Sequence, residues 1–220
     1  MRILITGSAS GIGHACAIYF MNKGHQVIGI DILPKPDSLD HPNYTHICYD
    51  VTEGVVDIPS IDILINNVGV QNSNDDIEIN LKSVIRLTEH YIKQKQLKSI
   101  VMVASTSAHN GAEFPEYAAS KGGLLTYTKN VAKRVAAFGC TCNSISPGGV
   151  LTALNNCVIQ DKQLWDEIMS MTPLKKWMTP EECAEWIYFL SVVNKSMTGQ
   201  DIIVDNGEMI NHKFVWAENS

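Results

Sequence analysis

Tyr117 and Lys121 carry the clearest chemical signal in the chain. Four residues apart on a helix, they share one face and lie about 6 Å apart along its axis. A free tyrosine has a pKa of about 10, and its use as a base near neutrality requires a shift of about 3 units, or roughly 4 kcal/mol. A neighbouring lysine cation provides an electric field of the required sign. The pair therefore predicts a tyrosine that removes a hydroxyl proton, as alcohol oxidation requires.

Ser105 precedes Tyr117 by 12 residues and directly follows an apolar run that predicts a strand. Its hydroxyl could hydrogen-bond the oxygen of a substrate and stabilise the charge that develops there. The sequence Ser-Thr-Ser at 105–107 also fits a plain polar turn, so both interpretations stay open at this point.

The tyrosine–lysine spacing alone decides little, because it occurs three times, as Tyr19/Lys23, Tyr91/Lys95 and Tyr117/Lys121. Tyr19 lies on the apolar face of a predicted helix and should pack against the sheet. Tyr91 lies near a helix end, away from the strand tips. Only Tyr117 begins a helix after the carboxyl end of a strand, which is where doubly wound sheets bind their ligands.

The elements that position these residues alternate between short apolar strands and longer amphipathic helices. Helices with apolar residues at i, i+3 and i+4 are predicted around 12–20, 77–92 and 124–135, and a further helix begins near Thr179. The strands are nearly continuous in Ile, Val and Leu, which is typical of a parallel sheet buried on both faces. The sequence therefore predicts an α/β fold, a doubly wound parallel sheet in a single domain over 1–220. The predicted strands are Arg2–Thr6, Gln26–Asp31, Thr45–Tyr49, Ile61–Asn66, Ser99–Ala104, Thr141–Ile145 and Ile202–Val204.

A glycine-rich turn, Thr-Gly-Ser-Ala-Ser-Gly-Ile-Gly at 6–13, connects the first strand to the first helix. Gly7, Gly11 and Gly13 permit a tight turn, close approach of the backbone to a pyrophosphate, and tight packing of helix on strand. The helix N-terminus offers N–H groups and the positive end of its dipole to phosphates. The spacing GxxxGxG differs from the common GxGxxG, and such turns also serve as plain connections. Its place between a strand and a helix nevertheless predicts a dinucleotide site.

Asp31 ends the second predicted strand, 18 residues after Gly13. A carboxylate there can accept hydrogen bonds from both hydroxyls of an adenosine ribose and would repel a 2′-phosphate, and the next residues supply no arginine. The predicted cofactor is therefore NAD rather than NADP. The alternative interpretation of Asp31 is a solvated carboxylate at a strand end. Asp50, which precedes Val51 after the third strand, could bond the adenine amino group, and an ordinary turn aspartate explains it nearly as well.

Composition excludes several classes of function. The 220 residues are 45% hydrophobic and 18% charged, which is typical of a globular chain. The formal net charge of −6 argues against nucleic-acid binding, which needs a concentrated positive surface. No apolar run approaches the roughly 20 residues of a membrane span, and no signal peptide precedes the first strand. Six scattered cysteines without paired metal-ligand spacing predict reduced thiols, no metal site and a cytoplasmic location.

The ordered set of these motifs resembles the classical short-chain dehydrogenase/reductase family, over Arg2 to about Gly207. Further matching segments are Asn-Asn-Val-Gly at 66–69, Asn80-Leu81, Tyr-Ala-Ala-Ser-Lys at 117–121, Ser-Pro-Gly-Gly-Val-Leu-Thr at 146–152 and Thr-Gly-Gln-Asp at 198–201. The resemblance implies a Rossmann-type fold, a nicotinamide cofactor and a catalytic tetrad of Asn80, Ser105, Tyr117 and Lys121. In the family the Asn is thought to hold a water in a proton relay through the Lys.

The same resemblance extends the predicted cofactor site. It implies that Asn67 lies against the adenosine side, that Lys121 also bonds the nicotinamide ribose, and that the backbone near Val150 bonds the carboxamide. The predicted cofactor-binding residues are Gly7, Ser10, Gly11, Ile12, Gly13, Asp31, Asp50, Val51, Asn67, Gly69, Tyr117, Lys121, Val150 and Thr152.

Two connections are shorter than the family pattern. Only 15 residues separate Val51 from Asn67, too few for the usual crossover helix, and the interval from Asn67 to Asn80 is also short. We expect a trimmed crossover, an intact cofactor site, one sheet face that is locally less covered and wider access for substrate. The segment at about 150–178 should form a substrate lid. Its apolar residues could line a pocket for a steroid, acyl or terpenoid ketone, or could pack the lid's own helices.

These inferences predict an NAD(H)-dependent oxidoreductase that interconverts a secondary alcohol and a ketone. A non-catalytic NAD-binding sensor or scaffold on the same fold is the alternative, because a fold alone does not fix a function. A sensor has no need to keep all four tetrad groups, so their presence favours the enzyme. The helices around 81–92 and 124–135 pair across a two-fold axis in related proteins, which predicts a homodimer or homotetramer.

Overall fold

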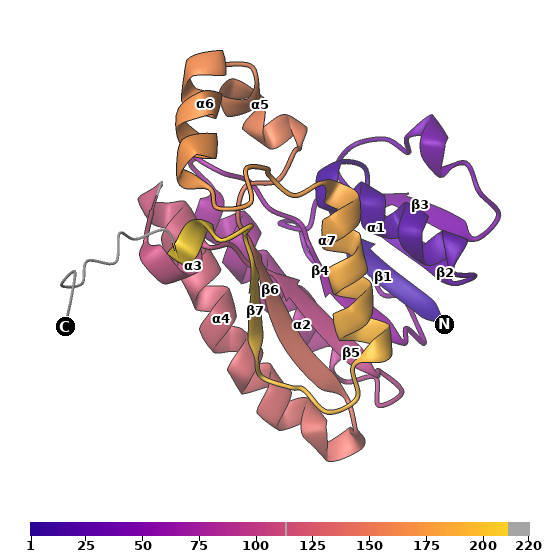
Figure 1. Ribbon diagram of the computed structural model, residues 1–220. Coiled ribbons are helices and arrows are strands. Elements are labelled where there is room, and N and C mark those ends of the chain that lie inside the picture. Colours follow the sequence, from indigo (N-terminus) through magenta and orange to yellow (C-terminus); the bar gives the residue numbers. More distant parts are fainter. Residues whose placement is uncertain (113, 211–220) are drawn as a thin grey trace.

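A computed structural model describes residues 1–112 and 114–210. Its centre is a parallel sheet of seven strands in the order β3-β2-β1-β4-β5-β6-β7 (Figure 1). The seven predicted strands are confirmed, with ends that differ by at most two residues. They are β1 (Arg2–Thr6), β2 (Gln26–Asp31), β3 (Tyr44–Cys48), β4 (Ile63–Asn66), β5 (Ser99–Val103), β6 (Thr141–Pro147) and β7 (Asp201–Val204).

Helices cover both faces of the sheet. Helices α1 (Gly11–Asn22) and α7 (Pro180–Tyr188) pack together on one face, and α2 (Ser83–Tyr91) and α4 (Pro115–Val135) cover the other (Figure 1). Successive strand residues alternate between the two cores: Ile3 and Ile5 pack under α1 and α7, whereas Leu4 packs on the opposite side. This arrangement explains why the central strands β1, β4 and β5 are nearly continuous in apolar residues, and it confirms the predicted Rossmann-type fold.

The remaining helical segments are short or lie at the carboxyl edge of the sheet. Helices α5 (Asn156–Ile159) and α6 (Lys162–Met171) stand beyond the strand ends, within the segment predicted to be a lid (Figure 1). The other segments are α3 (Ser107–Asn110), the π-helical turns η2 (Glu78–Lys82) and η5 (Phe189–Val193), and the 3₁₀ turns η1 (Asp37–Leu39), η3 (Ala136–Phe138), η4 (Ala153–Asn155) and η6 (Glu208–Ile210).

The connection from β3 to β4, where every residue is described, forms no helix. Its apolar residues Val51, Ile58 and Ile61 are buried in the core beside α2, so an extended segment covers this part of the sheet. In a helix the backbone carbonyls of this segment would accept hydrogen bonds from the helix itself. Here side chains of α2, and of the residues that follow it, donate to these carbonyls instead. Arg86 donates to the carbonyls of Val51 and Thr52, Tyr91 to that of Val56, and Gln94 to that of Ile58, at 2.7–3.0 Å.

Among the described residues, no helix combines the length and the apolar character that crossing a bilayer would demand.

Candidate active site

The glycine-rich turn at the end of β1 has the shape that its sequence predicts. Gly7 and Gly11 adopt φ values of 68° and 53°, in the left-handed region that favours glycine. A Cβ on Gly13 would lie 2.0 Å from the Gly7 carbonyl oxygen, so only glycine lets α1 approach β1 this closely. The first turn of α1 therefore presents its free N–H groups to the space beyond the strand ends.

Asn67 braces this turn from the end of β4. Its side-chain amide donates to the carbonyls of Thr6 and Gly7 at 3.0 and 3.1 Å. The Thr6 hydroxyl in turn accepts the backbone N–H groups of Asn67 and Val68, both at 3.1 Å. Two strands that are far apart in the sequence are locked together at the point where the strand order reverses, which is where such sheets bind ligands.

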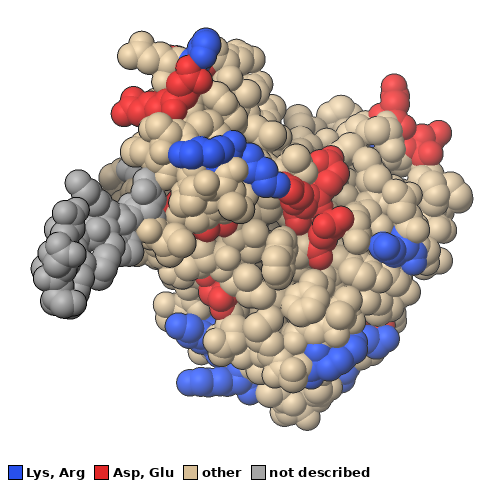
Figure 2. Space-filling view, viewed as in Figure 1, with Lys and Arg blue, Asp and Glu red and all other residues tan. Residues whose placement is uncertain are grey.

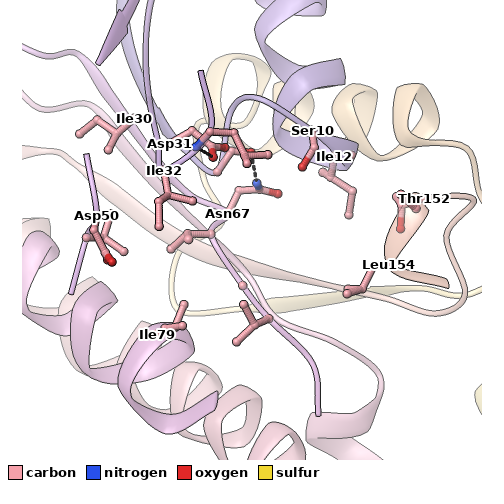
Figure 3. A pocket seen from close by; sticks show the side chains of 18 of the residues that line it. Ser10, Ile12, Ile30, Asp31, Ile32, Asp50, Asn67, Ile79, Thr152 and Leu154 are labelled. Atoms are coloured by element: carbon pink, nitrogen blue, oxygen red, sulfur yellow. Dashed lines mark hydrogen bonds between the residues drawn. The ribbon is translucent and has the colours of Figure 1, made fainter. Parts of the chain in front are cut away.

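A pocket of about 510 Å³ opens at this point. In Figure 3 it runs from Asp50 at one end, past Asp31 and Asn67, to Thr152 and Leu154 at the other. Ten of the predicted cofactor-binding residues line it: Gly7, Ser10, Gly11, Ile12, Asp31, Asp50, Val51, Asn67, Gly69 and Thr152. Gly13 is buried in α1 beside the turn, and its role is the close packing described above.

The Asp31 carboxylate is held in place at one wall of this pocket. It is 8% exposed and accepts the backbone N–H groups of Ala9 and Leu33, at 2.8 and 2.9 Å, one on each oxygen. Each oxygen keeps a further lone pair for a ligand hydroxyl. Asp50 lies at the far end and accepts two hydrogen bonds from Thr52 in a tight turn. The described lining residues include these two carboxylates and no lysine or arginine.

The residues present therefore fit a dinucleotide. A Cβ at position 7 or 13 would obstruct the glycine-rich turn, which leaves backbone N–H groups open to a pyrophosphate. At the end of β2 the fixed carboxylate of Asp31 has the sequence separation from the turn that is typical of a residue binding a ribose diol.

A second cavity of about 300 Å³ adjoins the first and shares Ile12, Asn67, Gly69 and Thr152 with it. Ser105, Tyr117, Lys121 and Val150 from the predicted set line this second cavity. Ser105 follows β5, is 8% exposed, and its hydroxyl accepts the N–H of Ser107 at 3.2 Å. Ser105 therefore belongs to a polar turn and also lines the cavity, so both interpretations of its sequence apply.

Tyr117 and Lys121 lie one turn apart near the start of α4, which begins at Pro115. The Lys121 ammonium is 5.7 Å from the centre of the Tyr117 ring and donates to the Val103 carbonyl at 3.0 Å. Lys121 is only 4% exposed, and burial lowers its pKa to about 8, partly opposed by the negative charge of Asp76. A buried cation thus stands beside the phenol ring.

Asn80 is fully buried behind the cavity, in the π-helical turn η2. Its amide donates to the Val70 carbonyl at 2.9 Å and to the Ser120 hydroxyl at 3.1 Å, and its oxygen accepts the Val70 N–H at 2.8 Å. Asn80 therefore ties the shortened loop after β4 to α4 at the residue before Lys121. Single π-helical turns occur frequently at functional sites.

The other two tyrosine–lysine pairs are remote from both cavities. Tyr91 ends α2 as expected, and its buried hydroxyl donates to the Val56 carbonyl at 2.7 Å. Tyr19 contacts Tyr188 of α7 edge-on, with ring centres 5.4 Å apart, as well as the apolar core. The expectation that Tyr19 packs on the sheet is therefore refined, because α7 covers that side of α1.

Two acidic residues near the site were missed by the sequence interpretation. Asp76 is 1% exposed and accepts the N–H and hydroxyl of Ser73, and its charge acts on Lys121. Glu208 lines the second cavity. Its position soon after the carboxyl end of the last strand was the signal that could have found it, since ligands gather at such ends.

Comparisons with known proteins agree with this arrangement. A family model described as enoyl-(acyl carrier protein) reductase matches residues 43–208. Among curated proteins, the short chain dehydrogenase adrF of Penicillium roqueforti is 32% identical over 93% of this chain and 95% of its own. The 3-oxoacyl-[acyl-carrier-protein] reductase FabG of Buchnera aphidicola subsp. Acyrthosiphon pisum is 31% identical over 92% and 95%.

Solved structures are similar over nearly the whole chain. A 4-hydroxyisoleucine dehydrogenase complexed with NADH superposes with a TM-score of 0.85 and 28% identity, covering 96% of this chain and 99% of that one. A putative 2-deoxy-d-gluconate 3-dehydrogenase from Agrobacterium tumefaciens with bound NADP gives a TM-score of 0.86 and 26% identity, covering 95% and 96%. With this fold, these motifs and these relatives, the chain belongs to the classical short-chain dehydrogenase/reductase family of oxidoreductases.

Proposed function

We propose that this protein is an NAD(H)-dependent oxidoreductase that interconverts a secondary alcohol and a ketone, with Tyr117 as general acid and base. The observation that carries the proposal is the convergence of Ser105, Tyr117 and Lys121 on one cavity. That cavity shares a wall with the pocket at the glycine-rich turn, so a dinucleotide and a small alcohol would meet there.

In the oxidative direction the nicotinamide cofactor supplies the hydride acceptor. Tyr117 acts as the phenolate, whose negative charge is favoured by the Lys121 cation one helical turn away, and it takes the hydroxyl proton onto its phenolic oxygen to become neutral. The Ser105 hydroxyl donates to the substrate oxygen and holds it in position. The bond from Lys121 to the Val103 carbonyl fixes the cation at the end of β5.

The choice of NAD over NADP rests on Asp31. In the proposed binding mode its carboxylate would face an adenosine 2′-phosphate, and the described residues that line this pocket supply no lysine or arginine to neutralise two negative groups. Asp50 and Val51 complete the far end of the pocket, as proposed for the adenine side.

A turnover screen tests the proposal. The protein is mixed with NAD or NADP and a broad panel of alcohols, and the absorbance of the reduced cofactor is followed. We expect reduction of NAD with at least one secondary alcohol and a clear preference over NADP. Tight NAD binding without turnover of any alcohol would favour the non-catalytic sensor, and a preference for NADP would contradict the role of Asp31.

The segment at about 150–178 is proposed as the substrate lid. Of its apolar side chains, Trp177 and Met178 are buried, whereas Leu151, Leu154 and Met171 are exposed. Trp165 packs edge-on against Trp177, so part of the segment forms a core of its own. A cavity of about 300 Å³ is at the small end of the range for ligand pockets, which favours a small substrate over a steroid.

A homodimer or homotetramer is the proposed assembly, through the outer faces of α2 and α4. The two helices are already joined within one chain, because Arg134 and Tyr127 of α4 both bond Glu89 of α2. Sedimentation at micromolar concentration should show a species heavier than one chain, and a monomer would contradict the proposal. The buried thiols Cys16, Cys142 and Cys183 support the proposed cytoplasmic location.

The proposed partner is a small molecule. On the face seen in Figure 2, lysine and arginine side chains fall into several separate groups with neutral surface between them. Nucleic-acid recognition would instead need a concentrated positive stripe.

A further inference from the structure

Asp31, the carboxylate proposed to bind the adenosine ribose, belongs to a closed ring of hydrogen bonds. Its two oxygens accept the backbone N–H groups of Ala9 in the glycine-rich turn and of Leu33 after β2. The Leu33 carbonyl lies 2.9 Å from Nε2 of His46 on β3. On the other side of the imidazole, Nδ1 of His46 lies 3.1 Å from the hydroxyl of Tyr44. The path thus leads from the pocket wall onto the neighbouring strand.

The ring closes at the glycine-rich turn. The Tyr44 hydroxyl lies 2.9 Å from the hydroxyl of Ser8, which directly precedes Ala9. Ser8 and Tyr44 are buried, so this contact is shielded from water. A Cβ on Gly29 of β2 would collide with both oxygens, so the glycine makes room for the contact. The hydrogen-bond ring consists of Ser8, Ala9, Asp31, Leu33, His46 and Tyr44.

The Leu33 carbonyl fixes the direction of these bonds. A backbone carbonyl only accepts, so Nε2 of His46 carries a hydrogen. In the neutral imidazole Nδ1 is then the acceptor, and the Tyr44 hydroxyl donates to it. The Ser8 hydroxyl in turn donates to the Tyr44 oxygen. Because each donor is oriented by the next group, loss of one side chain should loosen the whole ring.

The ring would act on a cofactor through the backbone of residues 31–33. Ile32 and Leu33 line the pocket and are 65% and 50% exposed, so side-chain packing holds this segment only weakly. The Leu33 backbone is instead tied on both sides, by its N–H to Asp31 and by its carbonyl to His46. A carboxylate whose supports can move binds a ribose diol less tightly than a fixed one.

We infer that Tyr44 and His46 are positioning residues for the cofactor, which hold the Asp31 carboxylate in the place where it selects NAD over NADP. The inference rests on the proposed NAD(H)-dependent function and adds two residues to it. Neither Tyr44 nor His46 is among the described residues that line the two cavities. Their loss should therefore change cofactor binding and leave kcat nearly unchanged.

Binding measured without turnover tests the inference. NADH and NADPH are titrated separately into the parent and into Tyr44→Phe, and the cofactor fluorescence gives each Kd. We expect Kd for NADH to rise about tenfold, an effect that one buried polar group left unpaired can produce. Kd for NADPH should change little, because its 2′-phosphate cannot use the ribose contacts of Asp31. An unchanged preference for NADH in a folded Tyr44→Phe protein would overturn the inference.

Tyr91→Phe is the matched control. Tyr91 is also a buried tyrosine with a hydrogen-bonded hydroxyl, which donates to the Val56 carbonyl at 2.7 Å, but it lies outside both cavities and the ring. This variant should lose stability as Tyr44→Phe does and keep the parent's Kd for both cofactors. Equal weakening of NADH binding in Tyr91→Phe would mean that a general loss of stability suffices, which would contradict the role of the ring.

Two variants of His46 isolate its bond to Leu33. His46→Gln keeps an amide N–H that can donate to the Leu33 carbonyl, whereas His46→Phe keeps a ring and loses both nitrogens. We expect Kd for NADH and KM for NAD to rise about tenfold in His46→Phe and less than about threefold in His46→Gln, with kcat nearly unchanged. His41→Phe, an exposed position in the connection before β3, should change neither. Equal effects of the two His46 variants would contradict the role of this bond.

The direction of the hydrogen bonds has its own spectroscopic test. Long-range ¹H–¹⁵N spectra of the parent show which imidazole nitrogen carries the hydrogen, and His46→Gln assigns the signals of this residue. We expect the neutral imidazole to carry its hydrogen on Nε2. A hydrogen on Nδ1 would contradict the bond from His46 to the Leu33 carbonyl.

The results also separate this inference from the proposed function. If no alcohol is oxidised but NADH binding depends on Tyr44 and His46, the oxidoreductase function fails and the positioning role stands. If alcohols are oxidised with NAD but neither residue affects Kd, the positioning role fails alone. A parent protein that binds neither NADH nor NADPH would overturn both.

Discussion

The Lys121 ammonium lies 5.7 Å from the centre of the Tyr117 ring, across one turn of α4, while its hydrogen bond reaches back to the Val103 carbonyl of β5. A helix and the strand before it thus share one buried cation. Burying a charge costs free energy unless the charge is paired and hydrogen-bonded, and among the described residues the Lys121 ammonium makes one hydrogen bond. We therefore expect this lysine to lower the stability of the fold while it serves the chemistry.

The variant Lys121→Met should be more stable than the parent at pH 7. Burial lowers the pKa of Lys121 from 10.5 to about 8, which disfavours the charged form in the folded state. The variant avoids this burial penalty but loses the hydrogen bond to the Val103 carbonyl. As the net result we expect the free energy of unfolding of Lys121→Met to exceed that of the parent by about 1–2 kcal/mol. Urea denaturation at pH 7 measures it, and catalytic activity should be lost.

The difference in the free energy of unfolding between Lys121→Met and the parent should also depend on pH, which provides a second test. Between about pH 8 and 10.5 the unfolded parent binds more protons at this lysine than the folded parent does. The parent's free energy of unfolding therefore rises with pH across this window, and the advantage of Lys121→Met should shrink there. A methionine variant that is less stable at pH 7, or an advantage that grows with pH, would show that burial does not penalise this lysine.

Gly13→Ala should damage both the fold and the cofactor site. The added Cβ would lie 2.0 Å from the Gly7 carbonyl oxygen, so α1 has to move away from the turn. Overpacking of this kind costs about 1–3 kcal/mol, and we expect NADH affinity to fall as well. Thermal unfolding and NADH fluorescence report the two effects.

Gly122→Ala is the matched control for this substitution. A Cβ at position 122 of α4 meets only the Ala108 carbonyl, at 3.8 Å, which is an ordinary contact. Because alanine favours a helix over glycine by about 0.5–1 kcal/mol, this variant should be as stable as the parent or more so. If Gly13→Ala matches Gly122→Ala in thermal stability and in NADH affinity, the close approach of α1 to the turn is not required for either.

Asp31→Asn should weaken the preference for NAD. The variant loses the negative charge and one of two acceptor oxygens, so KM for NAD should rise and KM for NADP should fall. Asn keeps an acceptor for Ala9 or Leu33 and disturbs the turn less than alanine would. Initial rates with both cofactors give the ratio of kcat/KM. An unchanged ratio would mean that another residue selects the cofactor.

Much of the fold could be predicted from the sequence because its local signals agree with one another. The central strands β1, β4 and β5 are nearly continuous in apolar residues, as burial on both faces requires. Thr179 with Glu182 forms the cap that marks the start of α7. The missing crossover helix followed from chain length, because residues 52–66 cannot hold one. That Arg86, Tyr91 and Gln94 would satisfy the carbonyls of this segment could not be predicted, since these contacts depend on packing.

Some residues of the candidate site could likewise be predicted from the sequence, and others could not. Gly7 and Ser105 were predicted because they follow strands, Asp31 because it ends one, and Lys121 because it lies near the start of a helix. The fold brings such positions to one edge of the sheet. Glu208 was missed because its place in the cavity wall depends on a contact with Gly149, which is 59 residues away in the chain. The π-helical turn at Asn80 was also missed, because its sequence has the same periodicity as an ordinary helix.

Tyr117→Phe is the most direct test of the central claim. The substitution removes one oxygen and little volume, and the glycine-rich turn and Asp31 are untouched, so the protein should fold and bind NADH with similar affinity. Because general acid–base catalysis contributes about 10²–10⁴-fold, we expect kcat for alcohol oxidation to fall at least about 10²-fold. Tyr19→Phe is the control, because Tyr19 also has a lysine one turn away, with the Lys23 ammonium 5.2 Å from its ring, but lies outside both cavities. A Tyr117→Phe protein as active as its parent, or a folded Tyr19→Phe protein that is equally impaired, would contradict the account.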